Sequence, residues 1–281
     1  MKTLFALVAI IAIGWAQPKW DDLKNAYQYD PKTDLKVEVS DKDDSEAFHQ
    51  HIAFTNAKGE KVAGLFLRPK GDLKYPCVLL LHGLTSRKEM MINMYGRRLV
   101  RSGFAVLALD APNHGERQSG SRALGVAAMG DMIQGGVLDY RQALEYLKSR
   151  KDVDNDRIGL LGYSMGAMMG AILAGVDDRV KASVLCVGGD VVQSMIATLP
   201  EELRARAQFV SPANYVGRIS PRPVLFINGK NDNVVNEAAA KRLHEAAKEP
   251  KEIVWADAAH ILGETDNKKA IDWLVDKLGR K

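Results

Sequence analysis

A serine stands between two glycines in the segment Gly162-Tyr163-Ser164-Met165-Gly166, directly after the apolar run Arg157 to Leu161. This pattern predicts a strand, a tight turn and a helix, with the serine hydroxyl raised above the end of the strand. Glycines are required on both sides because a side chain there would collide with the neighbouring strand or helix. A hydroxyl placed in this way can attack a carbonyl carbon. We therefore expect Ser164 to be a catalytic nucleophile.

A serine hydroxyl is a weak nucleophile at neutral pH and needs an imidazole base, which in turn needs a carboxylate to fix its tautomer. Of the six histidines, His260 lies in a loop just after the apolar run Glu252 to Ala256. Asp232 follows the run Pro223 to Ile227 in the same way. Open α/β sheets place their sites at the carboxyl ends of such strands. The chain order serine, acid, histidine therefore predicts His260 as the base and Asp232 as the acid.

Two other aspartates remain alternatives for the acid. Asp257 is nearer to His260 in the sequence, and Asp110 ends the run Phe104 to Leu109. Asp110 comes before the serine and so does not fit the chain order. An aspartate after a glycine turn, as at Asp232, is also common simply as turn chemistry.

Acyl transfer builds negative charge on the carbonyl oxygen, and two fixed backbone N–H groups can stabilise that charge. We expect one of them from Met165, at the N-terminal end of its helix. We expect the other from Leu84, which follows His82 and Gly83 at the end of the run Cys77 to Leu81. Gly83 leaves room for a substrate, and His82 is expected to brace this loop rather than to react.

The elements that position these residues follow from the hydrophobic pattern. Residues 35–67 alternate between apolar and polar, which indicates an antiparallel entry into a sheet. After them come six short apolar runs, typical of parallel strands buried on both faces. The runs are Cys77 to Leu81, Phe104 to Leu109, Arg157 to Leu161, Ala182 to Val187, Pro223 to Ile227 and Glu252 to Ala256. Helical spacing predicts crossover helices at Met90 to Ser102, Met132 to Lys148, Met165 to Ala174, Ala238 to Lys248 and Lys268 to Leu278.

This pattern predicts a single α/β domain over residues 17–281. The segment Gly188 to Tyr215 is longer than a usual connection and contains an amphipathic piece, Val191 to Arg206. We expect a small cap insertion around residues 188–215.

The first sixteen residues have the order of a signal peptide. Lys2 is followed by the apolar stretch Leu4 to Ile13 and then by the small residues around Ala16. The apolar stretch is shorter than the roughly 20 residues that span a bilayer. We expect cleavage after Ala16, a secreted or periplasmic protein and no stable membrane anchor.

Charge and cysteine usage exclude other classes of partner. The chain has 39 Lys and Arg against 35 Asp and Glu, a net charge of +4 without basic runs, and no nucleic-acid partner is expected. Cys77 and Cys186 are too few for a disulfide scaffold or a cysteine zinc site, so we expect core thiols. His49 and His51 lie two residues apart but lack a third ligand, and no metal is expected.

Several motifs together resemble those of a known family. They are Leu79-Leu80-Leu81-His82-Gly83, Leu109-Asp110-Ala111-Pro112-Asn113-His114-Gly115, the Ser164 pentapeptide, Pro221-Arg222-Pro223-Val224-Leu225-Phe226-Ile227 and Ala259-His260. From about Pro76 to Leu278 the chain resembles the α/β-hydrolase family, and its dienelactone-hydrolase and acyl-esterase branch most. The resemblance implies an eight-stranded, mostly parallel sheet with helices on both faces, no cofactor and a covalent acyl-serine intermediate. Ser164 departs from the cysteine of dienelactone hydrolase, so that enzyme's own activity is not expected.

The sequence therefore predicts a serine hydrolase of small-molecule carboxylic esters, with sugar or phenolic esters as candidate substrates. The alternatives are a serine peptidase of the same fold and a noncatalytic binding protein that kept the fold. Such peptidases usually carry a propeller or large cap, for which the roughly 60 residues before Cys77 are too few. Arg117 could bind a substrate carboxylate, but we expect neighbouring carboxylates to hold it.

Overall fold

The computed structural model describes residues 18–118, 126–196 and 198–279. Its centre is a nine-stranded sheet in the order β1-β2-β3-β5-β4-β6-β7-β8-β9. The strands are β1 (Glu38–Lys42), β2 (Phe48–Thr55), β3 (Lys61–Arg68), β4 (Tyr75–Leu81), β5 (Ala105–Leu109), β6 (Val153–Tyr163), β7 (Val180–Cys186), β8 (Val224–Gly229) and β9 (Lys251–Ala256). Strands β4 to β9 pair in parallel, and β1, β2 and β3 extend the sheet in antiparallel fashion. The six apolar runs are therefore the parallel strands, as predicted.

The predicted number of eight strands is wrong by one. All five residues of β1 are exposed, and the strand pairs with β2 alone at the edge of the sheet. A strand that buries neither face contributes little to a hydrophobic core, so the usual architecture does not require it. In this chain it forms an additional edge, where Lys61 of β3 pairs with Glu38 across the sheet surface.

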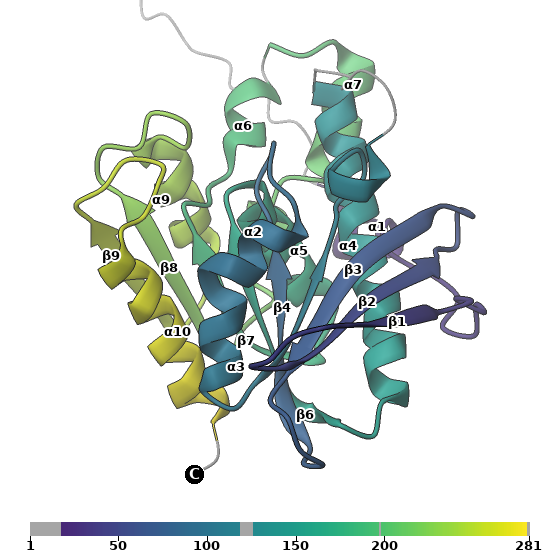
Figure 1. Ribbon diagram of the computed structural model, residues 1–281. Coiled ribbons are helices and arrows are strands. Elements are labelled where there is room, and N and C mark those ends of the chain that lie inside the picture. The colour runs from purple at the N-terminus through teal and green to yellow at the C-terminus, as the bar shows by residue number, and fades with distance from the viewer. Residues whose placement is uncertain (1–17, 119–125, 197, 280–281) are drawn as a thin grey trace, which may run out of the picture.

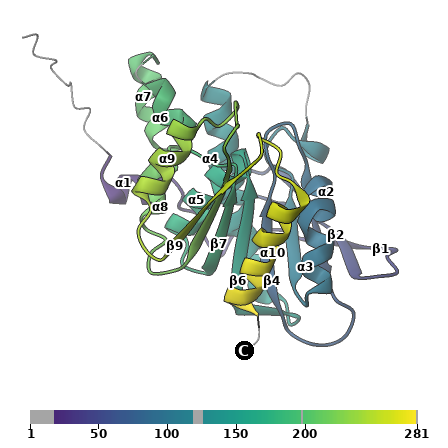
Figure 2. The same ribbon diagram turned by 90° about the vertical axis from the view of Figure 1, so that its left-hand side faces the viewer.

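Helices cover both faces of the sheet (Figures 1 and 2). One face carries α2 (Lys88–Met91), η1 (Ile92–Gly96), α3 (Arg97–Arg101) and α10 (Glu264–Leu278). The other face carries α4 (Val126–Ser149), α5 (Met165–Val176), α8 (Ala213–Val216) and α9 (Glu237–Ala246), with α1 (Trp20–Asn25) beside them. The predicted helix Met90 to Ser102 is thus three consecutive segments, and its middle part is wound more widely than an α-helix.

The two faces of the sheet build two hydrophobic clusters. Along β4, Cys77, Leu79 and Leu81 belong to one cluster, whereas Val78 and Leu80 belong to the other. This alternation explains the unbroken apolar run, because every residue of a doubly covered strand is buried. Cys77 and Cys186 are free, buried thiols, and burial raises the pKa of Cys186 to about 12. Both are core residues, as expected.

Within the segment predicted as a cap, two helices take the place of the single amphipathic piece Val191 to Arg206. They are α6 (Val191–Ile196) and α7 (Glu201–Gln208), which lie beyond the carboxyl ends of the parallel strands in Figure 1. Pro200 directly precedes α7 and separates the two, since proline is favoured at a helix start and disfavoured within a helix. The buried Asp190 fixes both ends of the segment, because its carboxylate accepts hydrogen bonds from the Gln193 amide and the Ser211 hydroxyl.

The predicted signal peptide, residues 1–16, lies outside the described residues. Within residues 18–118, 126–196 and 198–279, no helix combines the length and the apolar character needed to cross a bilayer.

Candidate active site

Ser164 occupies the turn between β6 and α5. Its φ of 54° and ψ of −116° are sparsely populated for a residue with a side chain, and such strain is found at functional sites when the surroundings impose it. The flanking glycines let the strand and the helix pack closely around this turn. A Cβ on Gly162 would lie 2.2 Å from the carbonyl oxygen of Gly166, and one on Gly166 would lie 2.0 Å from that of Leu81. The pentapeptide thus has the strand, turn and helix context that its sequence predicts.

The structure brings His260 and Asp232 to this serine. Nε2 of His260 lies 2.9 Å from Oγ of Ser164, and Nδ1 lies 2.8 Å from Oδ2 of Asp232. The side chain of Asp232 is 1% exposed, and its other oxygen accepts hydrogen bonds from the amides of Val234 and Val235. With the Nδ1 proton donated to the carboxylate, Nε2 is free to accept the serine proton.

Neither alternative aspartate occupies this position. Asp257 is exposed at the start of the His260 loop. Asp110 is fully buried, and its carboxylate accepts hydrogen bonds from the ammonium of Lys88 and from the amides of Lys88 and Glu116. Asp232 is therefore the carboxylate that the geometry pairs with His260.

The two backbone amides predicted to hold an oxyanion belong to segments that both adjoin the serine. The Met165 amide is in the first turn of α5, where N–H groups have no intrahelical partner. On the other side, a Cβ on Gly83 would lie 3.3 Å from Cβ and 3.9 Å from Oγ of Ser164. The loop that carries Leu84 therefore passes next to the nucleophile, and a side chain at position 83 would crowd Ser164.

Two buried histidines hold the Leu84 loop against the loop that follows β5. His82 donates from Nδ1 to the Gly83 carbonyl and accepts the Ala111 amide at Nε2, 2.9 Å away. Burial lowers the pKa of His82 to about 4, so the imidazole is neutral and can act as this acceptor at neutral pH. His114 accepts the amide of Thr85, whose φ is 66°. The sequence predicted a bracing role for His82 and gave none to His114.

A buried ammonium joins the same two loops, and the sequence analysis missed it. Lys88 is 1% exposed, and its Nζ lies 2.7 Å from carboxylate oxygens of both Asp110 and Glu116. Although burial alone would lower it, hydrogen bonds to these carboxylates raise the pKa of Lys88 above its usual value. The charge is therefore retained and compensated inside the protein. The one sequence signal of a buried lysine was its position close to the apolar residues Met90 and Met91.

Arg117 is held by carboxylates, as expected, but they lie outside the loop Asp110 to Arg117 that was expected to supply them, and the pair with Asp139 is buried rather than at the surface. Its guanidinium lies 2.6 Å from Asp139 and 2.9 Å from Glu60, and its side chain is 6% exposed. The histidines of β2 also have acidic partners: His49 lies 3.3 Å from Asp44 and His51 lies 3.0 Å from Glu116. Across the described residues, His, Cys, Asp and Glu side chains form no group of three that could bind a metal ion.

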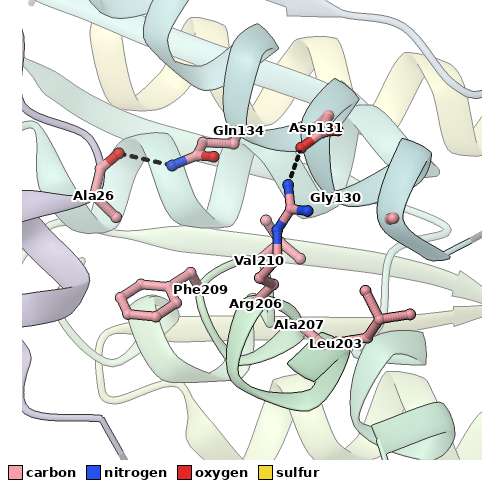
Figure 3. A pocket seen from close by; sticks show the side chains of 10 residues that line it. Ala26, Gly130, Asp131, Gln134, Leu203, Arg206, Ala207, Phe209 and Val210 are labelled. Atoms are coloured by element: carbon pink, nitrogen blue, oxygen red, sulfur yellow. Dashed lines mark hydrogen bonds and ion pairs between the residues drawn. The ribbon is translucent and has the colours of Figure 1, made fainter. Parts of the chain in front are cut away.

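A separate pocket of about 270 Å³ lies between α4 and the cap helix α7 (Figure 3). Its described lining consists of Ala26, Ala127, Gly130, Asp131, Gln134, Leu203, Arg206, Ala207, Phe209 and Val210. An ion pair of 2.7 Å between Arg206 and Asp131 borders it. None of these lining residues belongs to the Ser164, His260 and Asp232 group.

Comparisons with known proteins agree with this architecture. Acetyl xylan esterase 1 from Thermoanaerobacterium sp. JW/SL YS485 superposes with a TM-score of 0.78 at 21% identity, covering 91% of this chain and 92% of that one. The α/β hydrolase GrgF from Penicillium sp. sh18 superposes with a TM-score of 0.67 at 15% identity, covering 83% and 99%. The predicted α/β-hydrolase fold is therefore confirmed.

Sequence relatives include Esterase YjfP of Escherichia coli K12, which is 26% identical over 192 residues, 63% of this chain and 77% of that protein. The chain spans about half the length of several other curated relatives that it matches. The model of the dienelactone hydrolase family matches residues 62–270. That match includes all the residues of the site and well over half of the sequence, and the chain belongs to the dienelactone hydrolase family.

Proposed function

We propose that this protein hydrolyses carboxylic esters through an acyl-serine intermediate, with Ser164 as nucleophile, His260 as general base and acid, and Asp232 as the orienting carboxylate. The supporting observation is the unbroken chain of contacts from Oγ of Ser164 through the two ring nitrogens of His260 to Asp232. The name of the relative YjfP is that of an esterase, which supports the same reaction.

In the first half of the reaction, Oγ of Ser164 attacks the ester carbonyl carbon while its proton passes to Nε2 of His260. The carbonyl electron pair moves to the oxygen, which accepts hydrogen bonds from the amides of Leu84 and Met165. The tetrahedral intermediate then collapses, the bond to the alcohol oxygen breaks, and the alcohol takes the proton from Nε2. Asp232 stabilises the imidazolium between these two proton transfers.

The second half removes the acyl group. A water molecule attacks the acyl-serine carbonyl and gives a proton to Nε2, and the oxyanion forms again between the same two amides. When this intermediate collapses, the bond to Oγ breaks and Ser164 regains the proton from His260. The carboxylic acid leaves, and the site returns to its starting state without any oxidant, reductant or cofactor.

We assign esters with small acyl groups, on sugar or phenolic alcohols, as the substrate class. The loops around Ser164 carry exposed apolar side chains: Leu84 is 43%, Val234 66% and Ile261 80% exposed. Such a rim favours an alcohol with an apolar or ring face, because contact would remove these side chains from water. The esterase from Thermoanaerobacterium that shares the fold acts, by its name, on acetyl xylan.

The protein is also proposed to be exported, with cleavage after Ala16. Lys2, the apolar stretch and the small residues before the cleavage site support this, and all of them precede the first described element, α1. N-terminal sequencing of the protein from the periplasm or medium would start at Gln17. Retention of Met1 in a cytoplasmic fraction would contradict export.

The function is tested with a fluorophosphonate probe and a panel of aryl esters of increasing acyl length, with aminoacyl amides included. We expect the label on Ser164, turnover of short-chain esters and none of the amides. Ser164→Ala should fold normally, lose the label and lose turnover by about 10³ or more, since the three groups act as a unit. Amide turnover would favour a peptidase, and no label or turnover would favour a noncatalytic protein.

A further inference from the structure

Tyr163 directly precedes the nucleophile and is the last residue of β6. Its hydroxyl reaches across to the loop of residues 257–263, which carries the histidine. It donates a hydrogen bond of 2.8 Å to the carbonyl of His260 and accepts one of 3.1 Å from the amide of Leu262. One hydroxyl therefore binds the backbone on both sides of Ile261.

The tyrosine is suited to this double contact. Burial raises the pKa of Tyr163, so the hydroxyl keeps its proton near neutral pH and donates it to the His260 carbonyl. Its ring meets the imidazole of His260 edge to face, with centroids 6.3 Å apart and an interplanar angle of 73°. The hydroxyl thus fixes the backbone of His260 while the ring limits the space in which the imidazole can move.

The far end of this loop is also held by Leu262, whose side chain is buried in the core and whose carbonyl accepts a hydrogen bond of 3.4 Å from Asn267. Fewer contacts hold the backbone between His260 and the Leu262 amide. Ile261 is 80% exposed and so contributes little packing. Asp232 holds the imidazole through Nδ1, which fixes the ring but not the carbonyl or the next amide. On the incoming side, the Ala258 carbonyl accepts the amide of Asn231. At the His260 carbonyl and the Leu262 amide, the hydroxyl of Tyr163 supplies the hydrogen bonds.

These contacts close a short ring of interactions. Tyr163 is covalently joined to Ser164, and its hydroxyl binds the backbone of His260. The imidazole of His260 in turn contacts Oγ of Ser164 and completes the ring. We propose that Tyr163 is a positioning residue, which fixes the base relative to the nucleophile by tying the backbone of one to the backbone of the other. This inference rests on the proposed serine mechanism.

The test is Tyr163→Phe, which removes the hydroxyl and keeps the ring. We expect kcat for a short-chain aryl ester to fall roughly tenfold to a hundredfold, the scale of loss from a small misplacement of a catalytic group. KM should stay within about twofold, because Tyr163 acts on the base and not on substrate binding. Labelling of Ser164 by the fluorophosphonate should slow in parallel. An unchanged kcat would overturn the proposal.

Tyr140→Phe is the matched control. The hydroxyl of Tyr140 also donates to one carbonyl, that of Leu80 at 2.5 Å, and accepts one amide, that of Leu109 at 2.9 Å, but it does not contact the His260 loop. This variant should lower the unfolding temperature and leave kcat within about twofold. An equal fall in kcat in both variants would mean that the loss of any buried tyrosine hydroxyl suffices, and the positioning role would be excluded.

Amide exchange in the unaltered protein gives an independent test. The Leu262 amide should exchange with solvent slowly, although its neighbour Ile261 is exposed. Because the Leu262 side chain is itself buried, the variant separates the two causes: Tyr163→Phe should increase the exchange rate at least tenfold, and an unchanged rate would mean that burial alone protects the amide. Fast exchange in the unaltered protein would overturn the proposal even if the variant did not fold. Failure of the proposed function is distinct, because the unaltered protein would then show neither ester turnover nor label, whatever the exchange rate.

Discussion

The loops on the two sides of Ser164 are held by different kinds of interaction. On the β8–β9 side, defined as residues 230–236 and 257–263, backbone amides and one tyrosine hydroxyl place Asp232 and His260. On the β4–β5 side, defined as residues 82–88 and 110–118, buried histidines and the Lys88–Asp110 ion pair hold the loop of Leu84. The first side uses hydrogen bonds in which one partner is always a backbone group, whereas the second depends on side chains that must keep their charge state.

This difference matches the task proposed for each side. His260 must accept and release a proton in every cycle, so the groups that position it should not themselves titrate near neutral pH. Amides and a protonated tyrosine meet that requirement. The Leu84 loop has only to remain in place, and a buried ion pair is suited to fixing a position, although it contributes little net stability. The comparison predicts losses of activity without unfolding on the β8–β9 side and losses of stability on the β4–β5 side.

The largest expected effect is that of Asp232→Asn. The amide cannot accept the Nδ1 proton as the carboxylate does, so the imidazole takes the wrong tautomer and kcat should fall by roughly 10⁴. Thermal unfolding should change little, because the amides of Val234 and Val235 can still donate to the remaining side-chain oxygen. Ester turnover and circular dichroism measure the two quantities.

Asp257→Asn is the matched control for this prediction. Asp257 is exposed and near His260 in sequence, so its substitution should leave kcat within about twofold. If Asp257→Asn caused the large loss and Asp232→Asn did not, the acid would be misassigned. The proposed difference between the β8–β9 side and the β4–β5 side would then no longer hold for the catalytic acid.

The second effect is the cost of breaking the buried ion pair with Lys88→Met. Asp110 would remain buried without its cation, and removing one partner of such a pair typically costs about 3–5 kcal/mol. Urea denaturation measures the loss. Lys61→Met is the control, since the Lys61–Glu38 pair has side chains 65% and 72% exposed and should cost no more than about 1 kcal/mol. Equal costs for the two variants would show that the Lys88 charge is not effectively buried.

Sequence reasoning reached the parts of the molecule that local pattern determines. Five of the six parallel strands are continuous apolar runs because both of their faces are covered, whereas the edge strand β9 is partly exposed. The two glycines around Ser164 identify its turn, because the backbone leaves no room for a side chain at either position. The sequence order also selected Asp232 and His260, which the structure brings together. Their catalytic roles remain a prediction.

Other features depend on contacts that no local pattern records. The sequence around Lys88 is that of an ordinary surface lysine. Its burial depends on the ion pair with Asp110, which is 22 residues away in the sequence. The Tyr163 hydroxyl binds a backbone group 97 residues further along the chain. The strand β1 lies within the segment 35–67 that was predicted to enter the sheet, but because none of its residues is buried, the apolar pattern does not mark it as a separate strand. The division of the cap helix, by contrast, could have been predicted from Pro200, since proline disrupts a helix interior.

The third effect concerns acid pH and the buried histidines. Burial holds the pKa of His82 and of His244 at about 4, whereas an unfolded chain has a histidine pKa near about 6.5. Between these values the unfolded state binds more protons, so stability falls as the pH drops from about 6.5 to 4, by about 3 kcal/mol per histidine. Urea denaturation at several pH values measures the slope. A flat profile over this range would contradict the neutral, buried state of both rings.

His244→Gln separates the two contributions. His244 lies in α9 and contacts Asn228, away from the β4–β5 side, and a glutamine cannot titrate. The variant should lose about half of the pH dependence that the two histidines supply. The remaining half reports on His82, whose protonation would release the Ala111 amide and loosen the Leu84 loop.

The smallest effect is that of Glu116→Gln. Its loss of stability tests whether Glu116 belongs to the buried ion-pair network of Lys88 and Asp110. Glu116 contacts the same ammonium as Asp110, yet its side chain is 50% exposed, whereas Asp110 is fully buried. Water and salt screen a half-exposed carboxylate, so its removal should cost no more than about 1 kcal/mol, with a smaller loss in high salt. A loss above about 2 kcal/mol, insensitive to salt, would mean that Glu116 and Asp110 share the burial of Lys88. The charged network would then reach through Glu116 to His51 in β2, and the Leu84 loop would be anchored to the antiparallel part of the sheet as well.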